Sequence, residues 1–203
     1  MAFVNVTLPD GTVNEYASGI TCAEVITDAL GRKHGCLAAR IDGVECDLSR
    51  LIEQDCSVEG ILTDSDEGIY ILRHSAAHLL AQAVMSLYPG AKPTIGPAID
   101  RGFYYDFAME PITESDLKPI QKKMQELARK NFTVERIELS DEELQDYFAD
   151  NPYKLEIIKD KIEDGGGSTI YMQDDWYDLC LGPHVPNTSR SVSYTHLTLP
   201  TKA

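Results

Sequence analysis

The stretch RHSAAHLLAQAV, residues 73–84, lies inside the longest helical pattern of the chain and decides how the rest is divided. Apolar residues recur at spacings of three and four from residue 69 to about Tyr88, where a Pro-Gly pair ends the pattern. These apolar residues are Ile69, Leu72, Ala76, Leu79, Leu80, Ala83 and Leu87. The spacing predicts one long amphipathic helix, with Asp64 or Ser65 as its N-cap.

Two histidines lie on the other face of this predicted helix. His74 and His78 are four residues apart, roughly opposite the centre of the apolar stripe, and their neighbours on that face are Ala77 and Ala81. Because small neighbours leave room above the two rings, we expect this face to form the floor of a cleft. A histidine among leucines is most often a core residue with one satisfied hydrogen bond, so that interpretation stays open here.

The residues ahead of this helix predict a small unit of their own. FVNVTL and TVNEY alternate with period two around the turn PDG, which predicts a hairpin. Thr21 and Glu24 match a capping box for a helix that Gly31 ends, and the short strands CLAARIDG and SVEGILT follow. Strand pair, helix and further strands make a compact α+β unit over residues 1–62 that resembles a ubiquitin-like β-grasp module.

The acidic stretch TDSDEG, residues 63–68, marks the predicted boundary to a larger α+β domain over residues 63–190. In that domain GFYYDF and the segment after the glycine-rich turn DGGG have strand character, and SDEELQDYF begins a helix. Residues 115–131 predict another helix, despite Pro119 near its start. We therefore expect a long central helix against an antiparallel sheet.

Charge and cysteine content limit the class of protein. The chain has 203 residues, a formal net charge of −15 and 43% hydrophobic residues, which suits a globular protein of one or two domains. The negative field repels polyanions at long range, so contact with nucleic acid has to come from a local basic patch. Five cysteines without a CxxC pair are typical of a reducing compartment, so we expect a cytoplasmic location and neither a leader nor a membrane-spanning segment.

One basic cluster stands out in this acidic chain, on the helix predicted over residues 115–131. Its members are Lys118, Lys122, Lys123, Arg129 and Lys130. A solvated helix face is the commoner explanation for such a run, and a contact with nucleic acid is the alternative.

A second pair of reactive side chains lies near the end of the chain, in YDLCLGPHVP. Cys180 and His184 are four residues apart but separated by Gly182 and Pro183, so they belong to a strand end and a loop and not to a helix. Together with the HxxxH pair of the long helix they make four side chains of the types that zinc prefers. Spacing alone leaves open whether the two pairs meet.

Four motifs, in order along the chain, now indicate a family. RHSAAHLL, IGPAIDRGFYYDF, the pair Tyr153-Lys154 and DLCLGPHVPNT resemble the editing domain of threonyl-tRNA synthetases, preceded by the TGS module of those enzymes. The resemblance covers residues 1 to about 189 and implies hydrolysis of serine wrongly attached to tRNA(Thr). Such a second sieve is needed because one methyl group is worth only about 1–3 kcal/mol of discrimination.

The resemblance implies a role for each residue of the histidine and cysteine set. His74 positions or deprotonates the attacking water, and His78, Cys180 and His184 complete the polar wall. The threonyl type is understood to work without a bound metal, so we expect none. The related alanyl-tRNA editing domains use the same pattern for zinc, so a zinc site of these four residues stays open.

Further roles follow from the same resemblance. Lys154 stabilises negative charge or contacts the terminal nucleotide, Asp178 holds the α-amino group of the substrate, and Tyr104 or Tyr105 stacks on or hydrogen-bonds the terminal adenosine. The basic cluster is a candidate contact for the acceptor stem of tRNA. A non-catalytic unit that binds tRNA or protein is the alternative function.

The end of the chain departs from the family pattern. SVSYTHLTLPTKA, residues 191–203, breaks the resemblance abruptly, so we expect a non-native tail and exclude His196 from the site. The aminoacylation core, with its ATP, magnesium and zinc, is expected to be missing, so this chain needs no cofactor. We expect a monomer, whereas the full-length enzyme is expected to be a homodimer.

Overall fold

The structure is a computed structural model that describes residues 2–163 and 169–194, and this part forms two compact units. Within the described residues the first unit comprises 2–71 and 182–186, and the second comprises 72–163, 169–181 and 187–194. The chain first passes from one unit to the other inside the long helix α2 (Asp66–Leu87), and it returns to the first unit for residues 182–186. The domain bounds 1–62, 63–190 and 191–203 stay predictions.

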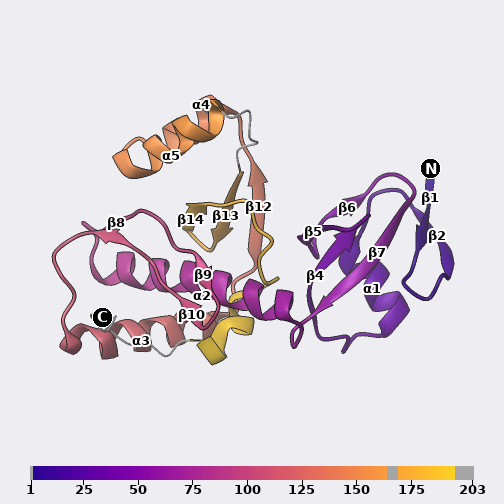
Figure 1. Ribbon diagram of the computed structural model, residues 1–203, viewed down its shortest axis with the longest axis horizontal. Coiled ribbons are helices and arrows are strands. Elements are labelled where there is room, and N and C mark those ends of the chain that lie inside the picture. Colours follow the sequence, from indigo (N-terminus) through magenta and orange to yellow (C-terminus); the bar gives the residue numbers. More distant parts are fainter. Residues whose placement is uncertain (1, 164–168, 195–203) are drawn as a thin grey trace. The chain divides into compact units, whose positions relative to one another are not determined.

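The first unit is built on a five-stranded sheet of order β2-β1-β7-β4-β5 (Figure 1). Its strands are β1 (Phe3–Thr7), β2 (Val13–Ala17), β4 (Cys36–Ile41), β5 (Val44–Asp47) and β7 (Cys56–Leu62). β1 is antiparallel to β2 and parallel to β7, and β4 is antiparallel to β5 and β7. This topology confirms the β-grasp fold and its first hairpin. A further pair, β3 (Ile20–Thr21) with β6 (Leu51–Ile52), and strand β5 were not predicted.

Helix α1 (Cys22–Leu30) begins and ends as its sequence predicts. The Oγ1 atom of Thr21 accepts from the Glu24 amide at 3.2 Å, and the Glu24 carboxylate accepts from the Thr21 amide at 2.9 Å, which is a complete capping box. Its buried side chains Val25 and Ile26 pack into the apolar core of the sheet. Burial of this face is what holds a nine-residue helix that is too short to be stable alone.

The second unit places α2 against an antiparallel sheet of order β12-β13-β14, as predicted. The sheet strands are β12 (Val134–Glu138), β13 (Thr169–Gln173) and β14 (Trp176–Leu179). The other elements are β8 (Lys92–Pro93), β9 (Ala98–Ile99), β10 (Gly102–Phe103), β11 (Phe107–Ala108), α3 (Glu114–Lys130), α4 (Asp141–Tyr147), α5 (Pro152–Glu163) and η1 (Thr188–Tyr194). Gln82 of α2 donates to the Gln173 carbonyl of β13, which fastens the helix to the sheet.

One expectation about α2 is wrong. Ala77 and Ala81 do not lie on an open cleft floor, because both are fully buried against Tyr105 and Trp176. The periodicity of a helix shows which face is apolar, but it does not show which distant segment covers the other face.

Smaller differences concern the loops and the helix ends. Ser65 provides the cap of α2, since its Oγ accepts from the Gly68 amide at 3.0 Å. Only the outer residues of GFYYDF are in strands, and α5 was not predicted. In the part of the chain that the structure describes, no helix combines the length and the apolar character needed to cross a bilayer. The glycine-rich turn and residues 195–203, with His196, lie outside the described residues, whereas 191–194 belong to η1.

Candidate active site

Three of the predicted site residues meet in the second unit. The Sγ atom of Cys180 lies 3.2 Å from Nε2 of His74, and the rings of His74 and His78 meet edge-on with centroids 5.3 Å apart. His78 and Cys180 are buried, whereas His74 is partly exposed. The structure therefore brings together side chains that lie 106 residues apart in the sequence.

The backbone explains why Cys180 reaches α2. β14 ends at Leu179, so Cys180 is the first residue beyond the strand. Its amide donates to the Thr169 carbonyl of β13 at 3.1 Å, and the Thr169 hydroxyl donates to the Cys180 carbonyl. These bonds continue the sheet by one residue and fix the direction of the thiol.

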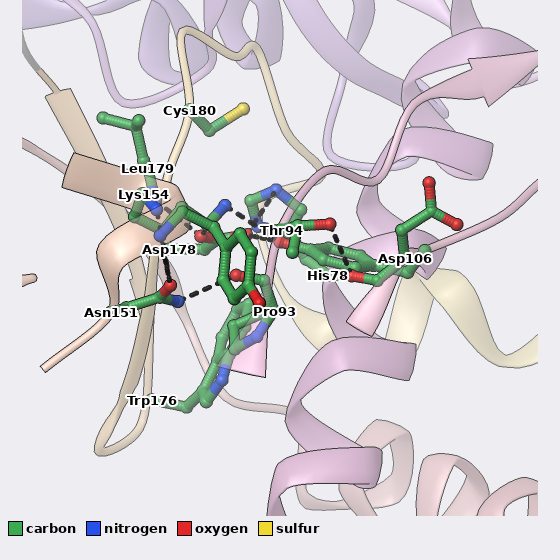
Figure 2. Close-up of polar contacts among 12 residues, drawn as sticks. His78, Pro93, Thr94, Asp106, Asn151, Lys154, Trp176, Asp178, Leu179 and Cys180 are labelled. Atoms are coloured by element: carbon green, nitrogen blue, oxygen red, sulfur yellow. Dashed lines mark hydrogen bonds and ion pairs between the residues drawn. The ribbon is translucent and has the colours of Figure 1, made fainter. Parts of the chain in front are cut away.

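A buried ion pair lies beside His78 (Figure 2). The Lys154 ammonium is 2.6 Å from Oδ1 of Asp178, and the two residues are only 3% and 1% exposed. Tyr105 donates its hydroxyl to Oδ2 of Asp178 and accepts from Lys154 at 3.1 Å. The same Oδ2 lies 3.9 Å from Nε2 of His78. This arrangement satisfies both buried charges, which would otherwise be expensive to remove from water.

Lys154 is held by the first turn of α5. Asn151 accepts the Lys154 amide at 3.3 Å with Oδ1, and its Nδ2 donates to the Pro93 carbonyl of β8 at 2.8 Å (Figure 2). Asn151 is therefore both the cap of the helix and its link to β8. The placement of Lys154 follows from this capped helix start, which the sequence motif Tyr153-Lys154 alone did not indicate.

Tyr105 is held by a loop that folds back on itself. Asp106 donates its amide to the Ile95 carbonyl at 2.8 Å and accepts from the Thr94 amide at 2.9 Å. A Cβ atom at Gly96 would lie 2.1 Å from the Tyr105 ring, so only glycine lets the ring pack there. The IGP motif thus has a physical reason in the placement of Tyr105.

Three other residues of this region were missed by sequence reasoning. The Trp176 ring meets His78 edge-on at 5.6 Å, and the side chains of Gln82 and Gln173 form a buried amide pair at 2.9 Å. Trp176 lies two residues before Asp178 in β14, on the same strand face, and this spacing was the signal that could have found it. Nothing in the sequence pairs the two glutamines.

Burial sets the protonation of the site. It lowers the pKa of His74, partly offset by the charge of Asp178. Burial holds the pKa of His78 well below the usual value of a histidine, and the charges of His74 and Lys154 lower it further. Burial and the Asp178 carboxylate raise the pKa of Tyr105. At neutral pH both imidazoles are therefore neutral and can accept a proton, and Tyr105 stays a donor.

The same residues could hold a metal ion. His74, His78 and Cys180 each offer one donor atom, and these atoms lie within 4.8 Å of one another. Two neutral imidazoles and a thiol are ligands that zinc accepts. The donor set therefore fits zinc chemically.

Two further predicted residues are His184 and Tyr104. His184 is in the segment 182–186 of the first unit, where it is buried and its amide donates to Oδ1 of Asp47 at 2.9 Å. Tyr104 is 44% exposed, whereas its neighbour Tyr105 is 8% exposed. The roles given to all eight site residues stay predictions.

Comparisons with known proteins match segments of both units described above. Residues 168–190 match the family model of the threonyl and alanyl tRNA synthetase second additional domain, and residues 4–63 match that of the TGS domain. Over 192 residues the chain is 45% identical to the threonine–tRNA ligase of Streptococcus suis (strain 05ZYH33) and 43% identical to that of Streptococcus pneumoniae (strain Hungary19A-6). The chain is homologous to part of a threonine–tRNA ligase.

The homology has a defined extent. It covers 92% of this chain and 29% of each of these ligases. The TGS match falls on the β-grasp sheet, and the second additional domain match falls on β13, β14 and the segment with Cys180 and His184. The predicted family, α+β fold and TGS module are confirmed.

Proposed function

We propose that this part of a threonine–tRNA ligase hydrolyses the ester between a wrongly attached serine and the terminal ribose of tRNA(Thr). The observation that carries the proposal is the His74–Cys180 contact beside the buried Lys154–Asp178 pair. A neutral histidine can act as a general base for water, and an enclosed cation can stabilise the oxyanion of ester hydrolysis. Buried charged groups beside residues with shifted pKa values are also most common at functional sites.

His74 is the proposed base, because it is neutral at physiological pH and the more exposed of the two histidines. It takes a proton from a water molecule whose oxygen attacks the ester carbonyl carbon. The ribose oxygen then leaves with a proton, and the products are free serine and tRNA. In this scheme Cys180 contacts the imidazole and fixes its direction.

Lys154 is proposed to stabilise the oxyanion that develops on the carbonyl. Its ammonium is held in place by Asp178 and Tyr105, so little reorganisation is needed when charge develops. Asp178 already accepts from Lys154, Tyr105 and the Leu179 amide. To hold the amino group of a substrate, as the resemblance implies, it would have to exchange one of these partners.

A basic stripe on α3 is the proposed contact with the tRNA acceptor stem. Lys118, Lys122 and Arg129 are exposed and recur at i, i+4 and i+11, which aligns them along about 16 Å of one helix face. None of the three has an ion pair within the described residues. Unpaired cations in a chain of net charge −15 suit a polyanionic partner.

The first experiment measures deacylation of seryl-tRNA(Thr) and threonyl-tRNA(Thr) by the full chain, with and without chelator, beside His74→Ala. Faster loss of serine that survives chelation and disappears in the variant is expected. His34→Ala, a histidine of the first unit, is the matched control and should keep the activity. Folded protein that binds the tRNA without accelerating hydrolysis would favour the alternative of a non-catalytic binding unit.

The basic stripe has a separate test, the salt dependence of tRNA binding. Replacing its three cations by glutamine should lower the slope of log K against log salt by about 0.9 for each lost phosphate contact. Lys159→Gln is the control, because Lys159 is paired with Glu163 on α5. An unchanged slope in the triple variant would remove α3 from the tRNA contact and leave the hydrolysis proposal intact.

A zinc-dependent hydrolase is the second candidate, favoured by the donor set of His74, His78 and Cys180. A zinc ion held there would supply a water of lowered pKa as nucleophile. Metal analysis of the purified protein and loss of activity on chelation would support this candidate and contradict the metal-free one. In the first, metal-free proposal the chain is also a cytoplasmic monomer that needs no cofactor.

A further inference from the structure

The sequence NPYK, residues 151–154, begins helix α5, and the proposed function uses only its lysine. Asn151 precedes the helix, and its Oδ1 accepts from the backbone amides of Tyr153 at 3.2 Å and Lys154 at 3.3 Å. Pro152 is the first helical residue, a position at which the missing amide hydrogen is not needed. The side chain of Asn151 therefore binds the backbone of Lys154 directly and fixes where α5 begins.

The same side chain also reaches a second segment, strand β8. Its Nδ2 donates to the carbonyl of the buried Pro93 at 2.8 Å (Figure 2). A side-chain amide offers both an acceptor and donors, so Asn151 bonds in two directions at once. A second bond joins the two segments, from the Lys92 ammonium to the Asp150 carbonyl at 2.6 Å, but it is exposed to solvent. Asn151 thus supplies the more enclosed of these two links between β8 and the start of α5.

Strand β8 leads to Tyr105, the second residue that contacts the Lys154 ammonium. β8 pairs with β11, and the residue after β8, Thr94, donates both its amide and its hydroxyl to the Asp106 carbonyl at 2.9 Å. Asp106 directly follows Tyr105, whose hydroxyl accepts from Lys154 at 3.1 Å. Asn151 therefore connects the segment that carries Lys154 with the segment that carries Tyr105.

The two connected side chains meet at one carboxylate. The Lys154 ammonium lies 2.6 Å from Oδ1 of Asp178, and the Tyr105 hydroxyl donates to Oδ2. Lysine has a flexible four-carbon side chain, so the position of its charge depends on its backbone and on these partners. A shift of α5 relative to β8 would move the ammonium away from Tyr105 or from Asp178. The bond from Asn151 to β8 opposes that shift.

We propose that Asn151 is a positioning residue for the hydrolysis of mischarged tRNA and acts through the ammonium of Lys154. This role rests on the proposed function, in which Lys154 stabilises the oxyanion. Groups that stabilise a transition state are most effective when they are in place before the charge develops, and the bond from Asn151 to Pro93 holds Lys154 in place. Asn151 itself touches no substrate in this scheme.

The test separates the two bonds of Asn151 in the full chain. Asn151→Ser keeps the helix cap, because serine caps about as well as asparagine, but its side chain is too short to reach the Pro93 carbonyl. A misplacement of about 1 Å in a site of this kind lowers the rate by about a hundredfold. The turnover number for seryl-tRNA(Thr) should therefore fall by about tenfold to a hundredfold in Asn151→Ser, with KM unchanged.

Ser140→Ala is the matched control. Ser140 caps α4 in the same unit, where its Oγ bonds the backbone amide and the carboxylate of Glu143 in its own helix. Melting temperatures show whether Asn151→Ser disturbs the fold more than the loss of this cap does. The turnover number of Ser140→Ala should stay near that of the unmodified chain.

A second readout follows the Lys154 ammonium itself. Because this group is buried and paired, its hydrogens exchange slowly with water, and isotope-labelled lysine should give an NMR signal that Lys154→Arg removes. The signal should shift or broaden in Asn151→Ser and stay unchanged in Ser140→Ala. If Asn151 only capped α5, the signal would stay unchanged in Asn151→Ser as well, because serine keeps the cap.

The outcomes separate this role from the proposed function. If the unmodified chain does not deacylate seryl-tRNA(Thr), the proposed function fails, and the Lys154 signal still reports whether Asn151 holds the ammonium. If the unmodified chain is active and Asn151→Ser is no slower than Ser140→Ala, the positioning role of Asn151 is overturned. A rate loss in Asn151→Ser with an unchanged Lys154 signal would also contradict it.

Discussion

The two units of the molecule differ in what they bury. Among the described residues of the first unit, 2–71 bury no polar or charged side chain and the segment 182–186 adds one, His184. The apolar core of this unit consists of valine, isoleucine, leucine, alanine and cysteine. In the second unit the buried set includes an ammonium, a carboxylate, an imidazole and two amides. These belong to Lys154, Asp178, His78, Gln82 and Gln173. Both units nevertheless have a well-packed apolar core.

The difference teaches that folding did not require the buried charges. A β-grasp sheet with one helix is stable on apolar contacts alone, and replacing a buried ion pair by apolar residues is often neutral or stabilising. Buried ionisable groups in the second unit therefore point to chemistry. Four changes can break or sharpen this comparison. Those in the second unit are read most directly from Trp176, the only tryptophan of the chain.

The largest effect is expected from Asp178→Ala. It leaves the Lys154 ammonium buried without its partner, which costs about 3–5 kcal/mol of the free energy of unfolding. Urea unfolding followed by Trp176 fluorescence measures this loss. A double change, Asp178→Leu with Lys154→Met, should recover most of it, and failure to recover would mean that the pair also stabilises the fold.

A smaller effect is expected from Gln82→Leu. This change leaves the Gln173 side-chain amide buried without its partner, at a cost of about 1–3 kcal/mol. Gln82→Leu combined with Gln173→Leu removes both polar groups and should lie closer to the unmodified chain. Equal losses in the single and double variants, measured by urea unfolding, would contradict this account of the amide pair.

The third effect appears only in acid. Burial, helped by the charges of His74 and Lys154, holds the pKa of His78 well below 6.5, so the unfolded chain binds a proton more readily than the folded one. The contribution of His78 is therefore complete above about pH 6.5 and is lost as the pH falls towards the lowered pKa. The free energy of unfolding of the second unit should therefore fall less steeply between about pH 7 and 5 in His78→Gln. His34→Gln, in the first unit, should not change this dependence.

The smallest effect is expected in the first unit, from Glu59→Ala. Glu59 is half exposed and pairs with Arg40 at 3.4 Å, which also contacts Glu45 and Glu67. A surface pair of this kind contributes less than about 1 kcal/mol. The contribution of the pair is measured by hydrogen exchange at amides of the β-grasp sheet, at low and at high salt. A larger loss would show that the first unit, too, depends on charge.

The parts of the fold that sequence predicted are those set by neighbours in the chain. The capping box at Thr21, the helix start at Ser140 and the turn after β1 are local, and each is found where it was expected. Strand β5 is four residues long and half exposed, so it has little apolar alternation to reveal it. The start of α5 depends on Asn151 reaching the Pro93 carbonyl, which no local pattern shows.

The same division holds for the site. The spacing of His74 and His78 placed them on one helix face, and the spacing of Cys180 and His184 singled out that second pair. Spacing left open whether Cys180 meets His74, because their contact spans 106 residues. The covering of α2 by Tyr105 and Trp176 was missed for the same reason. Long-range pairing follows from tertiary structure, and a single sequence contains no direct signal for it.

The sequence distance between His74 and Cys180 also has a consequence for synthesis. A ribosome that adds about 5–20 residues per second needs about 5–20 s to proceed from one to the other. During that interval the residues of α2 have been synthesised, while Trp176, which covers Ala77 and Ala81, has not yet been made. Ala77 and Ala81 thus lack part of their cover for seconds, and the His74–Cys180 contact forms only after most of the domain has been synthesised.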